Sequence, residues 1–225
     1  SAMVKPLAVE DKLLRREIPY MIGVTALFWA ICMDGWIGRL DGFILVGGLG
    51  VFLFMGIFSA KKLKPVAAEV PEAGERRPLW YLFLLVVGMG GLLLGAHLIV
   101  ESAIFIARYL GLSEVFIGIS IVAVGTSLPE LATSVVAGAR GEYDISIGNV
   151  VGSNVFNVCM VIGTVGLLNP MPVGLELMRF EFPAMLFLSL VLFVFSRTGF
   201  LLNRFEGCLL LLGYGLFVAL SYGMV

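Results

Sequence analysis

The side chains best suited to bind a ligand lie in the stretch IVAVGTSLPELATSV, which runs from Ile121 to Val135. Thr126 and Ser127 precede the carboxylate of Glu130 by four and three positions, so the three side chains share one face of a helix. Pro129 lacks an amide hydrogen, so it kinks a helix and leaves a carbonyl of the preceding turn without its donor. Hydroxyl, carboxylate and carbonyl oxygens together are the ligands that Na⁺ and Ca²⁺ prefer. The stretch therefore predicts a cation site.

A second polar face follows in the stretch SIGNVVGSNVFNVCMVIG, where Asn149, Ser153 and Asn157 recur every four residues. In the same stretch Gly148 and Gly152 form a GxxxG pattern, which predicts that another helix approaches closely. We expect that partner to be the helix of the first polar stretch, with the two polar faces toward each other. A structural role stays open for the asparagines, because Ser, Thr and Asn also join membrane helices through hydrogen bonds worth about 0.6–2 kcal/mol.

Glu130 fits a purely structural role poorly. A carboxylate at the centre of a membrane costs about 2.5–3.5 kcal/mol on insertion scales, and it usually marks an ion or proton path. No Lys or Arg lies at that depth in any span that the sequence predicts. His97 and Glu101, four positions apart, are open to two interpretations: part of a proton or access path, or a His–Glu pair at a helix contact.

The composition places these residues in a membrane protein. Of the 225 residues, 60% are hydrophobic and 14% are charged, whereas a soluble domain is about 45–50% apolar and about 25% charged. The net charge of −1 and the lack of a basic, aromatic-rich stretch argue against nucleic-acid binding. Cys32, Cys159 and Cys208 show no CxxC spacing and the chain has one histidine, which argues against zinc and haem. We expect the cysteines to be small buried residues.

Apolar runs of roughly 20 residues, the length that crosses a bilayer, divide the chain into seven predicted helices. The predicted fold class is therefore all-α, a polytopic membrane protein. Ser1, Ala2 and Met3 resemble the remnant of an expression tag, and residues 1–17 form a cytoplasmic lead-in. Residues 60–78, rich in charge and proline, form a predicted cytoplasmic linker. The predicted spans are 18–33, 41–59, 79–107, 115–139, 145–169, 182–195 and 206–223.

The basic residues orient these spans. Seven crossings put the termini on opposite sides, and loops on the cytoplasmic side carry the excess of Lys and Arg. With the N-terminus inside and the C-terminus outside, 12 basic residues fall in cytoplasmic segments and 3 in outer ones. The 12 are Lys5, Lys12, Arg15, Arg16, Lys61, Lys62, Lys64, Arg76, Arg77, Arg140, Arg197 and Arg204, and the 3 are Arg39, Arg108 and Arg179.

Two pairs of motifs indicate an internal repeat. Glu17-Ile18-Pro19 matches Glu181-Phe182-Pro183 at a distance of 164 positions. The motif RLDG at Arg39 matches RFEG at Arg204 at a distance of 165 positions. Within each copy the two motifs lie on either side of a short apolar span, and this shared arrangement favours duplication. Because five crossings separate the two copies, they are inverted, as in many secondary transporters.

The repeat predicts the organisation of the chain. Residues 18–59 are the last two helices of a first repeat, and residues 79–223 are a complete second repeat of five helices. The ion-binding helices of that second repeat are 115–139 and 145–169. Their counterparts in the first repeat would be among three helices that this sequence does not contain.

The motifs GTSLPE, from Gly125 to Glu130, and GNVVGSN, from Gly148 to Asn154, resemble the paired signatures of the cation/calcium exchanger superfamily, in particular prokaryotic sodium/calcium antiporters. The resemblance begins at about residue 14. It implies a ten-helix fold of two inverted five-helix repeats, of which this chain holds helices four to ten, as a fragment or a split subunit. The cation ligands that it implies are Thr126, Ser127, Glu130, Ser153 and Asn157, with the carbonyl of Ala123. The second polar face adds Asn149 to this candidate set.

The function that follows is secondary active antiport, and not enzymatic catalysis, in a prokaryotic inner membrane. The resemblance implies that Ca²⁺ is exchanged for Na⁺ by alternating access, and it leaves H⁺ and K⁺ open because some members of the family carry Asp at the position of Asn157. The cations are cargo, and no cofactor is expected. The expected partners are the lipid bilayer and either the missing helices or a second copy, because this chain holds half of the site. Two alternatives stay open: a passive cation channel, and a non-transporting membrane interaction subunit or inert fragment.

Overall fold

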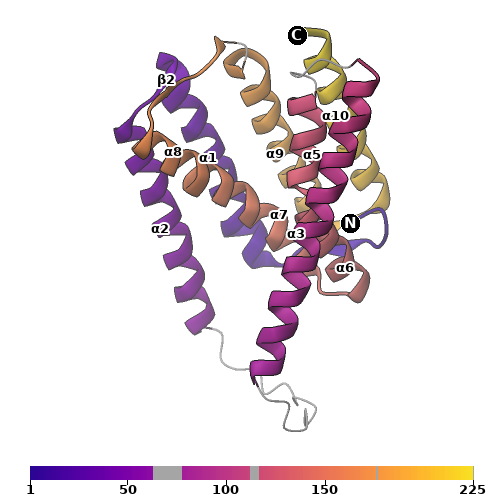
Figure 1. The fold of residues 1–225 in the computed structure, drawn as a ribbon. Coiled ribbons are helices and arrows are strands. Elements are labelled where there is room, and N and C mark those ends of the chain that lie inside the picture. Colours follow the sequence, from indigo (N-terminus) through magenta and orange to yellow (C-terminus); the bar gives the residue numbers. More distant parts are fainter. Residues whose placement is uncertain (63–77, 112–116, 176, 225) are drawn as a thin grey trace. The chain divides into compact units, whose positions relative to one another are not determined.

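The computed structural model describes residues 1–62, 78–111, 117–175 and 177–224, and its regular elements are mainly helices (Figure 1). Four strands of two residues each connect helix ends. In chain order the elements are β1 (Leu7–Ala8), η1 (Leu13–Glu17), α1 (Ile18–Ile31), η2 (Cys32–Asp34), β2 (Trp36–Ile37), α2 (Arg39–Lys62), α3 (Pro78–Tyr109), η3 (Ile117–Val122), α5 (Ala123–Thr126), α6 (Leu128–Arg140), α7 (Tyr143–Phe156), η4 (Asn157–Ile162), α8 (Gly163–Leu168), β3 (Met171–Pro172), η5 (Leu177–Glu181), α9 (Phe182–Arg197), β4 (Leu201–Leu202) and α10 (Arg204–Met224).

Six helical stretches in the described part of the chain are long and apolar enough to cross a membrane. The predicted spans 18–33 and 182–195 are short, and in the structure each is extended by a π-helical turn at its start, η1 and η5 respectively. The predicted all-α membrane fold is confirmed. The six stretches are Leu13–Asp34, Arg39–Phe58, Leu79–Tyr109, Tyr143–Leu168, Leu177–Arg197 and Arg204–Ser221.

The predicted span 115–139 is present as two helical pieces. Helical structure runs from Ile117 to Thr126 and resumes at Leu128, so the break lies at Ser127. The first two residues of the predicted span lie outside the described residues. The predicted linker 60–78 is shorter than expected at both ends, because α2 continues to Lys62 and α3 begins at Pro78. The residues between these two helices also lie outside the described part.

The chain forms two compact units. Unit 1 comprises Ser1–Phe54 and Glu130–Val225, and unit 2 comprises Met55–Pro129. Helix α2 passes from unit 1 into unit 2, and α6 passes back into unit 1. Each unit is described below by itself.

Unit 1 contains the same run of elements twice, at the spacing found in the sequence. The elements β3, η5 and α9 begin 164 positions after β1, η1 and α1, and β4 and α10 begin 165 positions after β2 and α2. Each copy has a turn glycine at the equivalent place, Gly35 with φ of 79° and Gly199 with φ of 73°. Glycine adopts this left-handed conformation without a steric penalty. Each strand of the first copy pairs with a strand of the second copy: β1 pairs antiparallel with β4, and β2 pairs antiparallel with β3.

The core of unit 1 lies where α1 contacts α7 and α9. Ile18 of α1 and Val151 and Val155 of α7 are fully buried. At the far end of α1, Phe28 contacts Phe182 of α9 with ring centroids 4.9 Å apart, so these two helices run antiparallel. All three cysteines are free thiols, and Cys32 and Cys159 are buried as predicted, while Cys208 is half-buried.

Helices α2 and α8 approach each other through glycines. A Cβ added at Gly42 would lie 2.6 Å from the carbonyl oxygen of Gly163 and 2.7 Å from the backbone nitrogen of Leu167. Within unit 1, no side chain and no backbone of another element lies within 4 Å of a Cβ added at Gly148 or Gly152. The predicted partner helix 115–139 lies mostly in unit 2, so its close approach to these glycines stays a prediction. Within unit 1, polar side chains join helix α7 to α6.

Candidate cation-binding site

The break at Ser127 exposes backbone oxygen just before the predicted ligand Glu130. Ser127 has φ of −93° and ψ of 1°, and its amide donates to the carbonyl of Val124 at 3.1 Å in a tightened final turn of α5. Pro129 is the second residue of α6, and amides in a first turn have no helical acceptor, so the proline costs that helix no hydrogen bond. Pro129 predicts an interruption of the helix, and the structure confirms it at Ser127, two residues before the proline.

Glu130 lies in the first turn of α6, where the positive end of the helix dipole favours a negative charge. Its Oε2 atom is buried and has no hydrogen-bond partner among the described residues. No described Lys or Arg forms an ion pair with it. A buried carboxylate oxygen without a donor is energetically costly. Cation coordination or protonation would remove that cost.

Asn149 joins α7 to α6 beside Glu130. Its Nδ2 donates to the carbonyl oxygen of Glu130 at 3.0 Å and to the Oγ of Ser134 at 3.0 Å. The amide group is thus used to hold the backbone that carries Glu130. This contact is the helix-joining role that the sequence left open for the asparagines.

The sequence analysis missed two serines in this contact. Ser146 is fully buried, and its hydroxyl donates to the carbonyl of Ser134 at 2.8 Å. Ser134 follows Glu130 by four positions and Ser146 precedes Asn149 by three. Each therefore extends a recognised polar face by one helical turn, and that spacing could have identified both.

The other residues of the second polar face contact their own helix. The hydroxyl of Ser153 donates to the carbonyl of Val150 at 3.1 Å, and Asn154 donates to the same carbonyl at 2.8 Å. Asn157 is exposed and begins η4, a stretch of π-helix. Single π-helical turns within α-helices are frequent at functional sites. Ser153 and Asn157 thus keep side-chain oxygen atoms that no other helix uses within the described residues.

Unit 2 holds the ligands predicted before the break. The Thr126 hydroxyl donates to the carbonyl oxygen of Ala123 at 3.1 Å, and that carbonyl has a second lone pair for another partner. Gly125 is buried against Val100 of α3. In α3, His97 Nε2 lies 3.6 Å from Glu101 Oε1, and both side chains are about two-thirds exposed, at 65% and 64%. This pair forms within one helix.

The oxygen atoms of the two polar faces are of the kind that hard cations prefer. Unit 1 brings Glu130, Ser134, Ser146 and Asn149 together, and unit 2 brings Thr126 and Ala123 together. The described residues contain no group of three or more His, Cys, Asp or Glu side chains that could hold a metal ion. One carboxylate with hydroxyl and carbonyl oxygens suits Na⁺ or Ca²⁺, whereas a resident transition metal prefers imidazole and thiolate.

Comparisons with known proteins agree with this chemistry. Residues 80–223 match the family model described as sodium/calcium exchanger protein. CaxA of Alkalimonas amylolytica is 35% identical over 225 residues, which cover 95% of this chain and 70% of that protein. The sodium/calcium exchanger MaX1 of Methanosarcina acetivorans is 39% identical over 141 residues, which cover 63% of this chain and 40% of that protein.

A solved structure shares the fold. The sodium-calcium exchanger NCX_Mj superposes with a TM-score of 0.76 at 27% identity, over 97% of this chain and 69% of that one. With six described helices able to cross a membrane, the chain is an integral membrane protein. The family match extends over more than half of the sequence, through the helices that carry both polar faces. The chain belongs to the sodium/calcium exchanger protein family.

Proposed function

We propose that this chain carries out secondary antiport of Ca²⁺ against Na⁺, with Glu130 as the charged ligand of the transported cation. The observation that carries the proposal is the buried Oε2 of Glu130, which has no hydrogen-bond partner in the described residues and lies at the start of a helix. Membership of an exchanger family supports the same conclusion. We propose transport and no enzymatic reaction, with the cations as cargo and no cofactor.

Coupling follows from the cost of moving a bare carboxylate. An ionised acid at mid-membrane costs about 2.5–3.5 kcal/mol on insertion scales. Ca²⁺ or Na⁺ bound to Glu130 removes that cost, and so does a proton. The alternating-access transition is therefore favoured for the loaded site and disfavoured for the empty one. Because the two cargoes compete for one carboxylate, movement of one requires return of the other.

We propose as ligands the residues that the two polar faces contain: Thr126, Ser127, Glu130, Ser153 and Asn157, with the carbonyl of Ala123. The contacts of Asn149 favour a positioning role over its predicted role as a ligand, since its amide holds the Glu130 carbonyl. Ca²⁺ takes six to eight oxygen ligands and usually more than one carboxylate. We therefore propose that the site is completed by a second set of ligands, from further helices or from a second copy.

We propose that the N-terminus lies in the cytoplasm and that the membrane is a prokaryotic inner membrane. The 12 to 3 distribution of basic residues supports the orientation. Impermeant maleimide labelling of single cysteines placed in the 63–77 and 198–203 segments tests it. Both segments should be protected in intact cells and labelled after permeabilisation.

Flux measurements on the natural full-length protein in liposomes test the antiport. Uptake of radioactive calcium should require an outward Na⁺ gradient and stop when that gradient is absent. Uptake that persists without a counter-ion would identify a passive channel. Absence of uptake under every gradient of Na⁺, K⁺ and H⁺ would identify a non-transporting subunit.

A further inference from the structure

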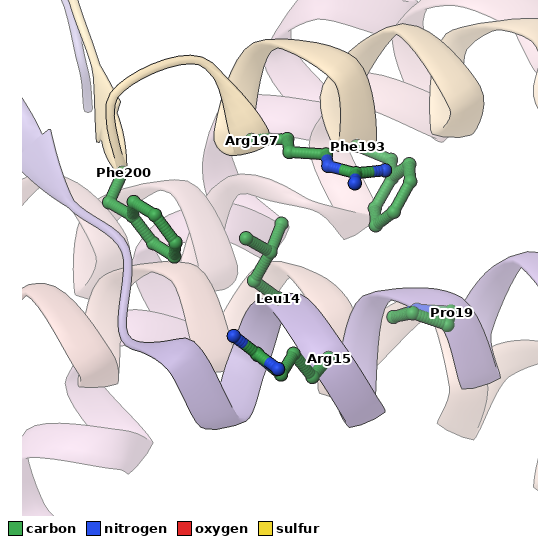
Figure 2. A pocket seen from close by; sticks show the side chains of 6 residues that line it. All are labelled: Leu14, Arg15, Pro19, Phe193, Arg197 and Phe200. Atoms are coloured by element: carbon green, nitrogen blue, oxygen red, sulfur yellow. The ribbon is translucent and has the colours of Figure 1, made fainter.

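A pocket of about 470 Å³ lies in unit 1 between the start of the first span and the end of α9. Figure 2 shows Leu14, Arg15 and Pro19 on the ribbon of η1 and α1, facing Phe193 and Arg197 on α9. Phe200 closes one side from the turn that follows α9. The lining therefore combines two guanidinium groups with four apolar side chains.

Both arginines lie at the same end of an antiparallel helix pair. Arg15 is in the first turn of the span Leu13–Asp34, and Arg197 is the last residue of the span Leu177–Arg197. Pro19 and Phe193 lie about one turn further into those spans. The pocket therefore has a charged mouth at the membrane interface and apolar walls toward the hydrocarbon, which is the polarity of a phospholipid.

The guanidinium groups of Arg15 and Arg197 differ in whether they form an ion pair. The Arg15 Nε donates to the Asp11 carboxylate at 2.6 Å. The nearby Lys12 pairs with Glu17 at 3.2 Å. Arg197 forms no ion pair within the described residues and is exposed. The mouth of the pocket therefore presents one guanidinium group that is free to bind an anion.

The internal repeat indicates that Arg197 is not required by the fold. Arg15 has an equivalent 164 positions later, Arg179, and Pro19 has Pro183. The equivalent of Arg197 in the first copy is Met33. The first copy forms the same helix with methionine at this position. The guanidinium group of Arg197 is therefore present in the second copy alone of the two.

Phe200 is held over the pocket by an unusual backbone conformation. Its φ of 54° lies in the left-handed region, which is rare for a bulky aromatic residue. The carbonyl of Phe200 accepts a hydrogen bond from the Val9 amide at 2.9 Å. This contact fixes the turn after α9 against the N-terminal segment, although the ring stays 46% exposed.

We propose that this pocket binds an anionic phospholipid, with the phosphate on Arg197 and Arg15 and an acyl chain along Leu14, Pro19 and Phe193. Basic pockets between membrane helices on the cytoplasmic side bind acidic lipid headgroups, and a guanidinium group matches the geometry of a phosphate. A free phosphate ion would leave the apolar wall unused. The inference uses the proposed orientation and is independent of the ion site at Glu130.

Native mass spectrometry of the purified full-length protein tests the proposal. The protein is titrated with palmitoyl-oleoyl phosphatidylglycerol, with the phosphatidylcholine of the same chains, and with inorganic phosphate. One phosphatidylglycerol should bind in preference to phosphatidylcholine. The substitution Arg197→Gln should weaken that binding about fivefold, since one Arg near an anionic surface contributes about 1 kcal/mol. The matched control Arg179→Gln removes the same charge at the repeat-equivalent position of Arg15 and should leave the binding unchanged.

Three results would overturn the proposal. Equal retention of phosphatidylglycerol by wild type and Arg197→Gln would show that this arginine does not bind lipid. An equal loss in Arg179→Gln would show that any interfacial charge suffices. Competition by inorganic phosphate at the affinity of the lipid would identify a phosphate site. Preserved thermal unfolding of Arg197→Gln in detergent separates a loss of binding from a loss of folding.

Discussion

Replacing Asn149 by Ala should loosen the contact between α7 and α6 and thereby displace Glu130. The side chain donates two hydrogen bonds, each of 3.0 Å, to the Glu130 carbonyl and the Ser134 hydroxyl. Hydrogen bonds between membrane helices contribute about 0.6 kcal/mol on average and about 1.7 at most. Loss of both should therefore destabilise the protein by about 1–2 kcal/mol.

Thermal unfolding in detergent, followed by intrinsic tryptophan fluorescence, measures this effect. A loss of 1 kcal/mol lowers the melting temperature of a protein of about 150–250 residues by about 2–4 °C, so we expect a decrease of about 2–8 °C for Asn149→Ala. Ser153→Ala is the matched control, because that hydroxyl donates only to Val150 of its own helix among the described residues. Its melting temperature should stay within about 2 °C of wild type.

A double-mutant cycle with Ser134→Ala isolates the contact. The two substitutions should be less than additive, with a coupling free energy of about 0.6 kcal/mol. The Ser146 hydroxyl keeps its acceptor in these variants, because it donates to the backbone of residue 134. Strict additivity, or an effect of Asn149→Ala no larger than that of Ser153→Ala, would refute the role of Asn149 in holding the Glu130 backbone.

Two further predictions concern the scaffold. Gly42→Ala should destabilise the protein by about 1–3 kcal/mol in the same unfolding assay, because its Cβ would meet backbone atoms of α8 at 2.6 and 2.7 Å. A Cβ at Gly47 in the same helix would meet no side chain and no other element's backbone within 4 Å among the described residues, so Gly47→Ala should be neutral or stabilising, and equal losses would contradict the α2–α8 contact. Glu206→Ala should cost about 1 kcal/mol, because the carboxylate accepts from the Asn203 amide at 2.8 Å and from the Thr198 hydroxyl at 3.1 Å at the start of α10. An unchanged melting temperature for Glu206→Ala would show that this cap does not stabilise α10.

Local chemistry made much of the fold and of the site predictable. Apolar run length located the spans, because it reflects the thickness of the bilayer. The missing amide of Pro129 located the break near Glu130, since that effect acts within one helical turn. The repeat at 164 and 165 positions agrees with the structure, in which α9 begins 164 positions after α1 and α10 begins 165 positions after α2. The predicted span 182–195 starts where α9 does, while the span 206–223 was predicted to start two residues after the start of α10.

Contacts between helices were harder to predict. They depend on the rotation of each helix about its axis and on its depth in the membrane, which one sequence does not specify. The GxxxG pattern at Gly148 and Gly152 predicted a close contact that is not present within unit 1, whereas the close approach at Gly42 and Gly163 had no such signal. Ser134 and Ser146 were overlooked because serine is common in membrane helices. Strands of two residues, such as β1 and β4, are too short to give a periodic signal.

The central claim is that Glu130 binds the transported cation, and Na⁺-driven uptake of radioactive calcium by the full-length protein in liposomes tests it most directly. Glu130→Gln keeps the size of the side chain and removes its charge, so uptake should fall to the level of protein-free liposomes. Glu142→Gln, a substitution of an exposed carboxylate that makes no capping hydrogen bond to α7, should transport as wild type does. Na⁺-driven calcium uptake at the wild-type rate in Glu130→Gln would contradict the account.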